Sequence, residues 1–464
     1  MKKVYMGVRL RRLREQQGLT QAALARLLGL SASYLNQMEQ NQRPLTVPVL
    51  LKLNAAFGTD VQLFSDEEEL RFVGDLRAAL GDQGAQVSLA EIREIATNMP
   101  EVARAVVQMQ ARLREATERA ELLAGRLSGH PVAGASPMAF EAVRDYFYER
   151  RNYIAVLDEA AEVIGGALTL PHLVDGLSQR LAELHGVRVA LDAQGGDLRR
   201  YDASSCVLHL SPLIRPAQQA FQIATQLAFL EQQGAIDSLA SEACLQSEES
   251  TELLRIGLAN YFAGAVILPY RAFLEAAESE CYDIELLAQR FDVGFETTCH
   301  RLSTLQRPEA RGVPFFFIRV DRAGNISKRQ SATDFHFSRI GGSCPLWGIY
   351  EAFSRPGEVL RQIAQMPDGR CYLWVARTVR HCHGGYGGSL KTFAVALGCD
   401  LVHAERLVYA RGLDLRNPAL ATPIGAGCKV CERSNCAQRA FPLVGRTLTV
   451  RSQRSGVVPY STDA

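Results

Sequence analysis

The spacing of apolar residues near the amino terminus predicts a domain of short helices over residues 1–64. A first helix with one apolar face ends at Gly18. Thr20 is a favourable N-cap for a second helix over residues 21–28, and Gly29 follows it as a tight turn. Two short helices joined by a glycine turn form a helix-turn-helix, so the pattern predicts this arrangement at the start of the chain.

The third helix of this domain begins with polar side chains. Ser31 caps it, it extends to Glu39, and a fourth helix is predicted over residues 47–57. In a helix-turn-helix the second helix of the pair enters the major groove, where short hydrogen-bonding side chains reach base edges. The residues that we predict to contact DNA are Gln21, Ser31, Ala32, Ser33, Tyr34, Asn36, Gln37 and Arg43.

The distribution of charge agrees with this interpretation. Residues 1–64 contain nine Lys or Arg and three Asp or Glu, a difference of +6 in a chain of net charge +1. A basic patch confined to one segment suits contact with the phosphate backbone. The run from Leu13 to Glu39 resembles the phage-repressor (Xre-type) helix-turn-helix family, and this resemblance implies DNA binding. A protein-interaction use of the same fold is the alternative.

The next segment, residues 65–139, reads as a connector. Residues 65–127 contain twelve acidic and eight basic side chains, which leaves a charge of −4. Residues 102–127 form one amphipathic pattern, and such a helix either pairs with its twin in a dimer or packs on its own domain. A stretch rich in Gly, Pro, Ser and Ala over residues 128–139 marks a domain boundary.

Residues 140–280 alternate helical and strand-like runs. We expect strands over 187–192 and 206–210, a long helix over 216–231 and a second helix through 259–266. Three sequence runs in this region resemble the zinc-peptidase-like domain of the ImmA/IrrE family: Phe221–Phe229, Leu258–Ala263 and Ile267–Pro269.

That family binds zinc through a His-Glu-x-x-His helix, whose two histidines lie one turn apart with the glutamate as general base. The matching positions are Thr225, Gln226 and Phe229, and none of them is a zinc ligand in this setting. The acid expected near Leu258 is also absent. We therefore predict a degenerate domain that serves as a scaffold, with no catalytic residue.

The last part, residues 281–464, is predicted to be a mixed helix and sheet domain. Two helices flank Gly294, strands cover 313–320 and 371–379, and a hairpin turns at 321–325. The expected fold class is an α-helical helix-turn-helix domain followed by an α+β sensor region.

Eleven cysteines are an odd number, and the amino terminus lacks the apolar stretch of a secretory signal. No run approaches the length of a membrane span, so we expect a cytoplasmic protein with reduced cysteines and no membrane contact. Clustered cysteines then indicate metal or cluster ligands rather than disulfides.

Cys428, Cys431 and Cys436 have the close spacing of such ligands. A [4Fe-4S] cluster is the first expectation, and zinc or three structural cysteines are the alternatives. Cys399 is our first choice for a fourth ligand; the other candidates are a non-protein ligand or one of Cys371, Cys382, His381 and His383.

Several motifs resemble the short-chain fatty acyl transcriptional regulators, which include regulators of propionate and acetate use: Arg301–Pro308, Gly324–Ala332, Cys344–Trp347, Gly398–Asp400 and the Cys428–Cys436 cluster. The resemblance implies a dimeric bacterial regulator that binds double-stranded operator DNA and senses acyl-coenzyme A. It also implies that the three clustered cysteines hold a [4Fe-4S] group, as in some members. The rival interpretations are a zinc metallopeptidase-type stress regulator that cleaves a repressor, and a DNA-binding antitoxin, which the length of the chain disfavours.

Overall fold

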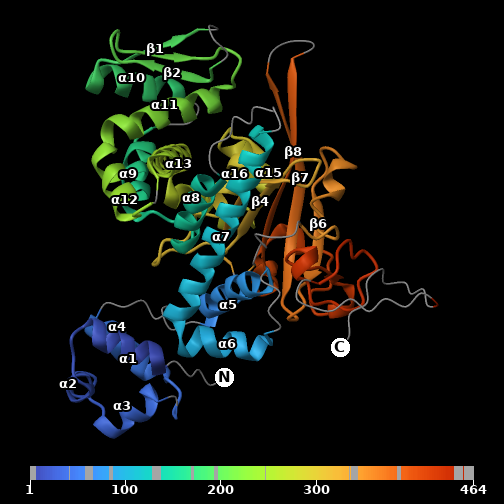
Figure 1. The fold of residues 1–464 in the computed structure, drawn as a ribbon. Coiled ribbons are helices and arrows are strands. Elements are labelled where there is room, and N and C mark those ends of the chain that lie inside the picture. Colours follow the sequence, from blue (N-terminus) through green and yellow to red (C-terminus); the bar gives the residue numbers. More distant parts are fainter. Residues whose placement is uncertain are drawn as a thin grey trace. The chain divides into compact units, whose positions relative to one another are not determined.

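The structure is a computed structural model that describes residues 7–40, 42–57, 66–82, 87–127, 137–168, 172–192, 197–245, 247–333, 335, 343–383, 388–443 and 453. The chain divides into two compact units, drawn in Figure 1. The first unit joins Met1–Ala124 with Asp334–Gly341 and Gly427–Ala464, and the second joins Gly125–Thr333 with Gly342–Ala426.

The first unit starts with the predicted helices α1 (Gly7–Gln16), α2 (Gln21–Leu27), α3 (Ala32–Glu39) and α4 (Val47–Phe57). The Thr20 hydroxyl accepts a hydrogen bond from the Ala23 amide at 3.2 Å, which caps α2. The Ser31 hydroxyl caps α3 by accepting from the Tyr34 amide at 3.1 Å. Gly29 has φ of 60°, a conformation that favours glycine, so the turn between the two helices is the predicted one.

The connector is a small helical domain rather than a single helix. It contains α5 (Asp66–Asp82), α6 (Leu89–Asn98) and α7 (Pro100–Leu127). Val73, Leu76, Ile92, Ala96 and Ala103 form its apolar core. Of these three helices the sequence predicted only α7, and it placed the start of that helix at residue 102 instead of 100. The long helix therefore packs on its own domain through one face.

In the second unit, a three-stranded sheet packs among helices. The strands are β1 (Arg188–Leu191), β2 (Arg199–Asp202) and β3 (Val207–Leu210), in the order β1-β3-β2. The helices are α8 (Pro137–Glu149), α9 (Ala155–Gly166), α10 (Leu173–His185), α11 (Pro216–Glu231), α12 (Gln233–Glu242), α13 (Glu248–Ile267) and α14 (Tyr270–Ser279). In Figure 1 the sheet lies along α10 and α11.

A six-stranded sheet follows the two predicted helices α15 (Ile284–Arg290) and α16 (Phe295–Leu302). Its order is β5-β4-β8-β7-β6-β9, antiparallel except for the β6–β9 pair. The strands are β4 (Phe316–Val320), β5 (Ile326–Ser331), β6 (Leu360–Gln365), β7 (Cys371–His383), β8 (Ser389–Asp400) and β9 (Thr422–Pro423). Short 3-10 helices occupy Glu351–Phe353, Leu401–Arg406, Val408–Ala410, Pro418–Leu420 and Cys428–Val430.

Two glycines permit close packing in this unit. A Cβ on Gly398 would lie 2.1 Å from the Phe316 ring on the neighbouring strand β4. A Cβ on Gly165 would lie 2.2 Å from the Val266 carbonyl oxygen, where α9 crosses α13. Both positions therefore require glycine for steric reasons.

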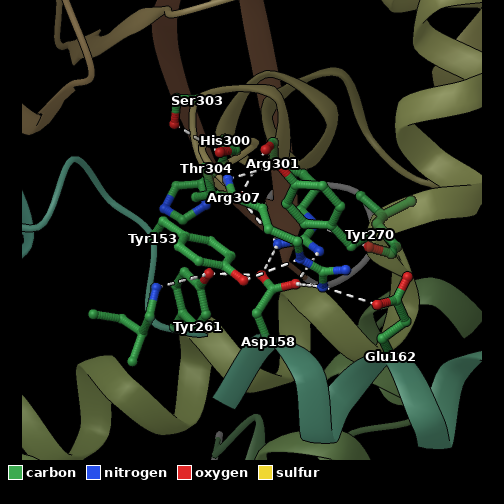
Figure 2. Close-up of polar contacts among 12 residues, drawn as sticks. Tyr153, Asp158, Glu162, Tyr261, Tyr270, His300, Arg301, Ser303, Thr304 and Arg307 are labelled. Atoms are coloured by element: carbon green, nitrogen blue, oxygen red, sulfur yellow. Dashed lines mark hydrogen bonds and ion pairs between the residues drawn. The ribbon is translucent and has the colours of Figure 1, made fainter. Parts of the chain in front are cut away.

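A buried ion network joins α9, α13 and α16 with the segment that follows α16 (Figure 2). Asp158 is fully buried, and the Arg301 guanidinium donates to both of its carboxylate oxygens, at 2.7 and 3.2 Å. The Tyr261 hydroxyl donates to the same carboxylate at 2.6 Å. Arg307 reaches Glu162 at 2.8 Å and stacks 4.1 Å above the Tyr270 ring. Burial alone would lower the pKa of Arg301, but the Asp158 carboxylate raises it.

Among the described residues, no single helix is long and apolar enough to span a membrane. Helices α13 and α14 reach that length and apolarity only together, across a bend of 61°.

Candidate DNA-binding face and cysteine loop

A buried carboxylate holds the three helices of the DNA-binding candidate together. Glu39 at the end of α3 is 6% exposed, and the Arg14 guanidinium of α1 donates to both of its oxygens, at 2.8 and 3.2 Å. The Gln21 side-chain amide of α2 donates to Glu39 at 3.0 Å and to the Asn36 side-chain oxygen at 3.1 Å. The hydrogen bond that Arg14 donates to Glu39 raises the pKa of Arg14. These bonds fix α3 relative to α1 and α2 and orient Asn36.

The predicted contact residues lie on α3 and in the segments beside it, except Gln21, which is the first residue of α2. Ser31, Ala32, Ser33, Asn36 and Arg43 are exposed, whereas Gln21, Tyr34 and Gln37 are half-buried. The Arg43 guanidinium lies 5.4 Å from the centre of the Tyr34 ring, a distance within cation–π range. The residues thus form one polar face beside a cation, which is what a major-groove reader needs. Their individual contacts with DNA remain predictions.

The cysteine loop, residues 427–443, belongs to the same unit as these helices. Cys428 and Cys431 are buried and Cys436 is half-buried. The Ala440 amide donates to the Cys428 sulfur at 3.1 Å, and the Arg433 amide donates to the Cys431 sulfur. Burial raises the pKa of the Cys431 thiol, although this amide bond opposes the shift.

Arg439 organises the loop, and the sequence analysis did not identify it. Its side chain is buried, and its guanidinium donates to the carbonyl oxygens of Cys428, Cys431, Arg433 and Phe441 at 2.6–3.3 Å. A buried cation and amide donors at two sulfurs suit thiolates that bind a metal or an iron–sulfur cluster. Glu432, between two of the cysteines, forms an ion pair with Arg77 of α5, so the loop contacts the connector.

In one respect the cysteine loop does not match a metal site. Within the described ranges, no three His, Cys, Asp or Glu side chains come together closely enough to hold a metal ion. Cys399, our first choice for a fourth ligand, lies on β8 in the second unit and packs in its apolar core. Burial raises the pKa of the Cys399 thiol. The cluster and its fourth ligand therefore stay predictions.

The other candidates for the fourth ligand lie in β7. Cys371 is half-buried, and its thiol donates to the Gly369 carbonyl oxygen at 3.6 Å. His381 faces Glu296 at 3.4 Å. The side chains of Cys382 and His383 lie outside the described residues.

Helix α11 carries the three positions that match the peptidase motif. Thr225 is buried, and its hydroxyl donates to the Phe221 carbonyl within the helix. Gln226 is 5% exposed and accepts a hydrogen bond from the Arg199 guanidinium of β2 at 3.3 Å. The same guanidinium lies 5.4 Å from the centre of the Phe229 ring. A cation thus lies against the helix face that carries zinc ligands in an active peptidase.

Comparisons with known proteins agree with these features. A helix-turn-helix family model matches residues 10–64, and an IrrE N-terminal-like domain model matches residues 182–303. The model "Short-chain fatty acyl coenzyme A regulator, C-terminal" matches residues 304–460. A DNA-binding head joined to a peptidase-like body defines the class: the protein is a helix-turn-helix transcriptional regulator and not an enzyme.

Three relatives align over nearly the whole chain. The HTH-type transcriptional regulator PrpR of Mycobacterium tuberculosis is 51% identical over 99% of this chain and 96% of that protein. RamB of the same species is 50% identical, over 99% of both chains. A propionyl-CoA carboxylase regulator of Cereibacter sphaeroides is 43% identical, over 99% of this chain and 98% of that protein.

A solved structure described as a Mycobacterium tuberculosis transcriptional regulator superimposes with a TM-score of 0.68 at 52% identity. The match covers 70% of this chain and 100% of the solved chain. The chain belongs to the short-chain fatty acyl coenzyme A regulator family.

Proposed function

We propose that this protein controls genes of propionate or acetate use in the bacterial cytoplasm. In this proposal it binds operator DNA as a homodimer and responds to a short-chain acyl-coenzyme A. The names of the relatives support the metabolic assignment, because one regulates propionyl-CoA carboxylase and the matched family model names acyl-coenzyme A. The observation that carries the proposal is the polar face of α3, held by Glu39, at the front of a chain of this family.

The dimer is supported by one face of α7. Val102, Met109 and Leu113 are 53%, 68% and 51% exposed, although all three are apolar. They are spaced by seven and four residues, which suits a coiled-coil seam. Another face of α7, with Ala103, Val106 and Val107, packs on the core that it shares with α5 and α6. A second copy of α7 is the partner that we propose for this seam, so that two heads meet paired half-sites.

The cysteine loop is the proposed site of a [4Fe-4S] cluster, with zinc as the alternative occupant. Cys428, Cys431 and Cys436 would bind it, and Arg439 would keep their backbone segment folded. Such a cluster supplies a centre that responds to oxidation. Because Glu432 of the same loop pairs with Arg77, a change in the loop would act directly on the connector.

The proposed response is a shift between conformations. An acyl-coenzyme A that binds one arrangement of the body more tightly increases the population of that arrangement. Operator affinity then changes because the spacing of the two heads either matches or fails to match the half-sites.

Fluorescence anisotropy of the full chain with a labelled promoter fragment tests the proposal. We expect binding that excess unrelated duplex does not abolish, and a protein colour in the visible range after anaerobic purification. Equal affinity for all duplexes would overturn the regulatory assignment. If the purified protein is colourless and contains zinc, zinc and not an iron–sulfur cluster occupies the cysteine loop. If it contains no metal, both proposed occupants are wrong.

A further inference from the structure

Strands β7 and β8 extend past the ends of their neighbours β4 and β6 as a two-stranded ribbon (Figure 1). Strand β6 pairs with β7 only as far as Ala376, and β4 pairs with β8 only from Ala394 onward. Beyond these points β7 and β8 remain paired with each other. Residues 377–383 and 389–393 therefore form a ribbon with which no other described strand pairs.

The base of the ribbon is anchored to α15 and α16 through one of its faces. The Arg377 guanidinium donates to the Glu285 carboxylate at 2.7 Å, and the His381 ring lies 3.4 Å from the Glu296 carboxylate. The two anchoring residues are four positions apart on β7, so they share a face. These contacts hold the ribbon on the body of the protein.

Three side chains near the end of the ribbon are exposed: Arg380 of β7, and Leu390 and Lys391 of β8. Leu390 is 55% exposed although it is aliphatic. Neither cation forms an ion pair or a side-chain hydrogen bond with any residue of the described ranges. The register places Arg380 and Leu390 on one face of the ribbon and Lys391 on the other.

The sequence around the ribbon lacks acidic residues. Residues 369–399 contain four Lys or Arg and two His, and no Asp or Glu. The whole chain has 50 acidic residues among 464, so a segment of this length would ordinarily contain about three. Exposed cations without nearby acids along the chain favour a polyanionic partner.

We infer that the ribbon is a second DNA contact of this regulator and that it binds in a minor groove of the DNA that the helix-turn-helix heads bind. Proteins use β-ribbons in DNA grooves. Minor-groove proteins combine cations with an aliphatic side chain that partly unstacks a base step and bends the duplex. Arg380 and Lys391, on opposite faces, meet the phosphates of the two DNA strands, and Leu390 is the wedge. This contact requires neither an effector nor a metal in the cysteine loop.

The salt dependence of operator binding tests the phosphate contacts. Fluorescence anisotropy of the full chain on an operator fragment gives the slope of the logarithm of affinity against the logarithm of salt concentration. The double variant Arg380→Gln, Lys391→Gln should reduce the magnitude of this slope by about 1.8 for each chain bound, because each phosphate contact contributes about 0.9.

The matched control is the double variant Arg188→Gln, Arg200→Gln. Both residues are exposed cations on strands of the small sheet, so the control removes the same charge elsewhere. It should keep the wild-type slope.

The bend of the operator fragment tests the position in the groove. Energy transfer between dyes at the two ends of the fragment should show that the wild type bends the DNA. Leu390→Ser should bend it less while the salt slope stays unchanged. Leu184→Ser removes a leucine of α10 that is 59% exposed and should bend the DNA like the wild type.

The results that would overturn the ribbon contact differ from those that would overturn the proposed function. If Arg380→Gln, Lys391→Gln keeps the wild-type slope, the ribbon does not contact DNA, while operator binding by the heads stands. If that variant changes only the sedimentation of the protein, the ribbon contacts another protein chain instead. Equal bending by the wild type and Leu390→Ser would refute the minor-groove position. Equal affinity of the wild type for all duplexes would refute the regulatory assignment itself. Thermal unfolding of each variant shows whether a loss of binding is a loss of folding.

Discussion

Replacing the buried carboxylate of Asp158 should destabilise the second unit severely. The Asp158→Asn variant keeps the size of the side chain and removes its charge. Arg301, which is 3% exposed, then loses the carboxylate that accepts two of its hydrogen bonds, at 2.7 and 3.2 Å. Removing one partner of a buried ion pair typically costs about 3–5 kcal/mol, because the remaining charge stays desolvated. Natural domains are stable by only about 5–15 kcal/mol, so the loss is a large fraction.

The chain supplies both a probe and a control. Its two tryptophans, Trp347 and Trp374, are buried in the second unit, so their fluorescence during urea unfolding reports on that unit. Glu162→Gln removes a carboxylate of the same network, but Glu162 is 22% exposed, whereas Asp158 is fully buried. A side chain that keeps contact with solvent should cost less to replace than a fully buried one. We expect the free energy of unfolding of Asp158→Asn to fall well below that of Glu162→Gln. Equal values for the two variants would refute the assignment of Asp158 as the centre of the network.

Three further predictions concern DNA binding, the cysteine loop and pH. Asn36→Ala should weaken operator binding by about 1–3 kcal/mol while non-specific binding stays unchanged, as anisotropy with operator and unrelated duplexes would show; a parallel loss on both would contradict a base contact. Arg439→Gln should lower the content of bound metal or cluster in the purified protein, because four loop carbonyls lose a shared donor; unchanged content would argue against this role. His300 is half-buried, and burial together with Lys328 lowers its pKa from 6.5 to about 3. The unfolded chain therefore binds a proton that the folded chain does not, and the stability present above pH 6.5 is lost as the pH falls toward 3. Allowing for solvent access, the wild type should lose about 1 kcal/mol more than His300→Gln between pH 7 and pH 5, measured by urea unfolding; identical losses would contradict the shift.

The sequence predicted those helices and turns whose ends are set by a single residue. Helix α11 begins at Pro216 and ends at Glu231, as expected, because proline suits the first turn of a helix. The turn at Gly29 and the caps at Thr20 and Ser31 follow from single residues in the same way. By contrast, β8 (Ser389–Asp400) was missed, because its second half, residues 394–399, is buried on both faces and therefore has no alternating pattern.

Contacts between distant residues could not be predicted. The Arg199–Gln226 bond joins positions 27 residues apart, and only the register of the small sheet brings them together. Arg439 looked like an ordinary charged residue beside the cysteines, since nothing local reveals that its guanidinium is buried under four carbonyls. The spacing of the three cysteines was informative, whereas the choice of Cys399 required a spatial relation that spacing does not contain.

The central claim is that a metabolite bound by the body changes how the heads bind DNA. The most direct measurement is the affinity of the full chain for its operator while propionyl-coenzyme A is titrated from zero to saturation. The account predicts a change in affinity that saturates with the ligand and that coenzyme A alone does not reproduce in full. An operator affinity that stays constant across the whole titration, in a protein that demonstrably binds the ligand, would contradict it.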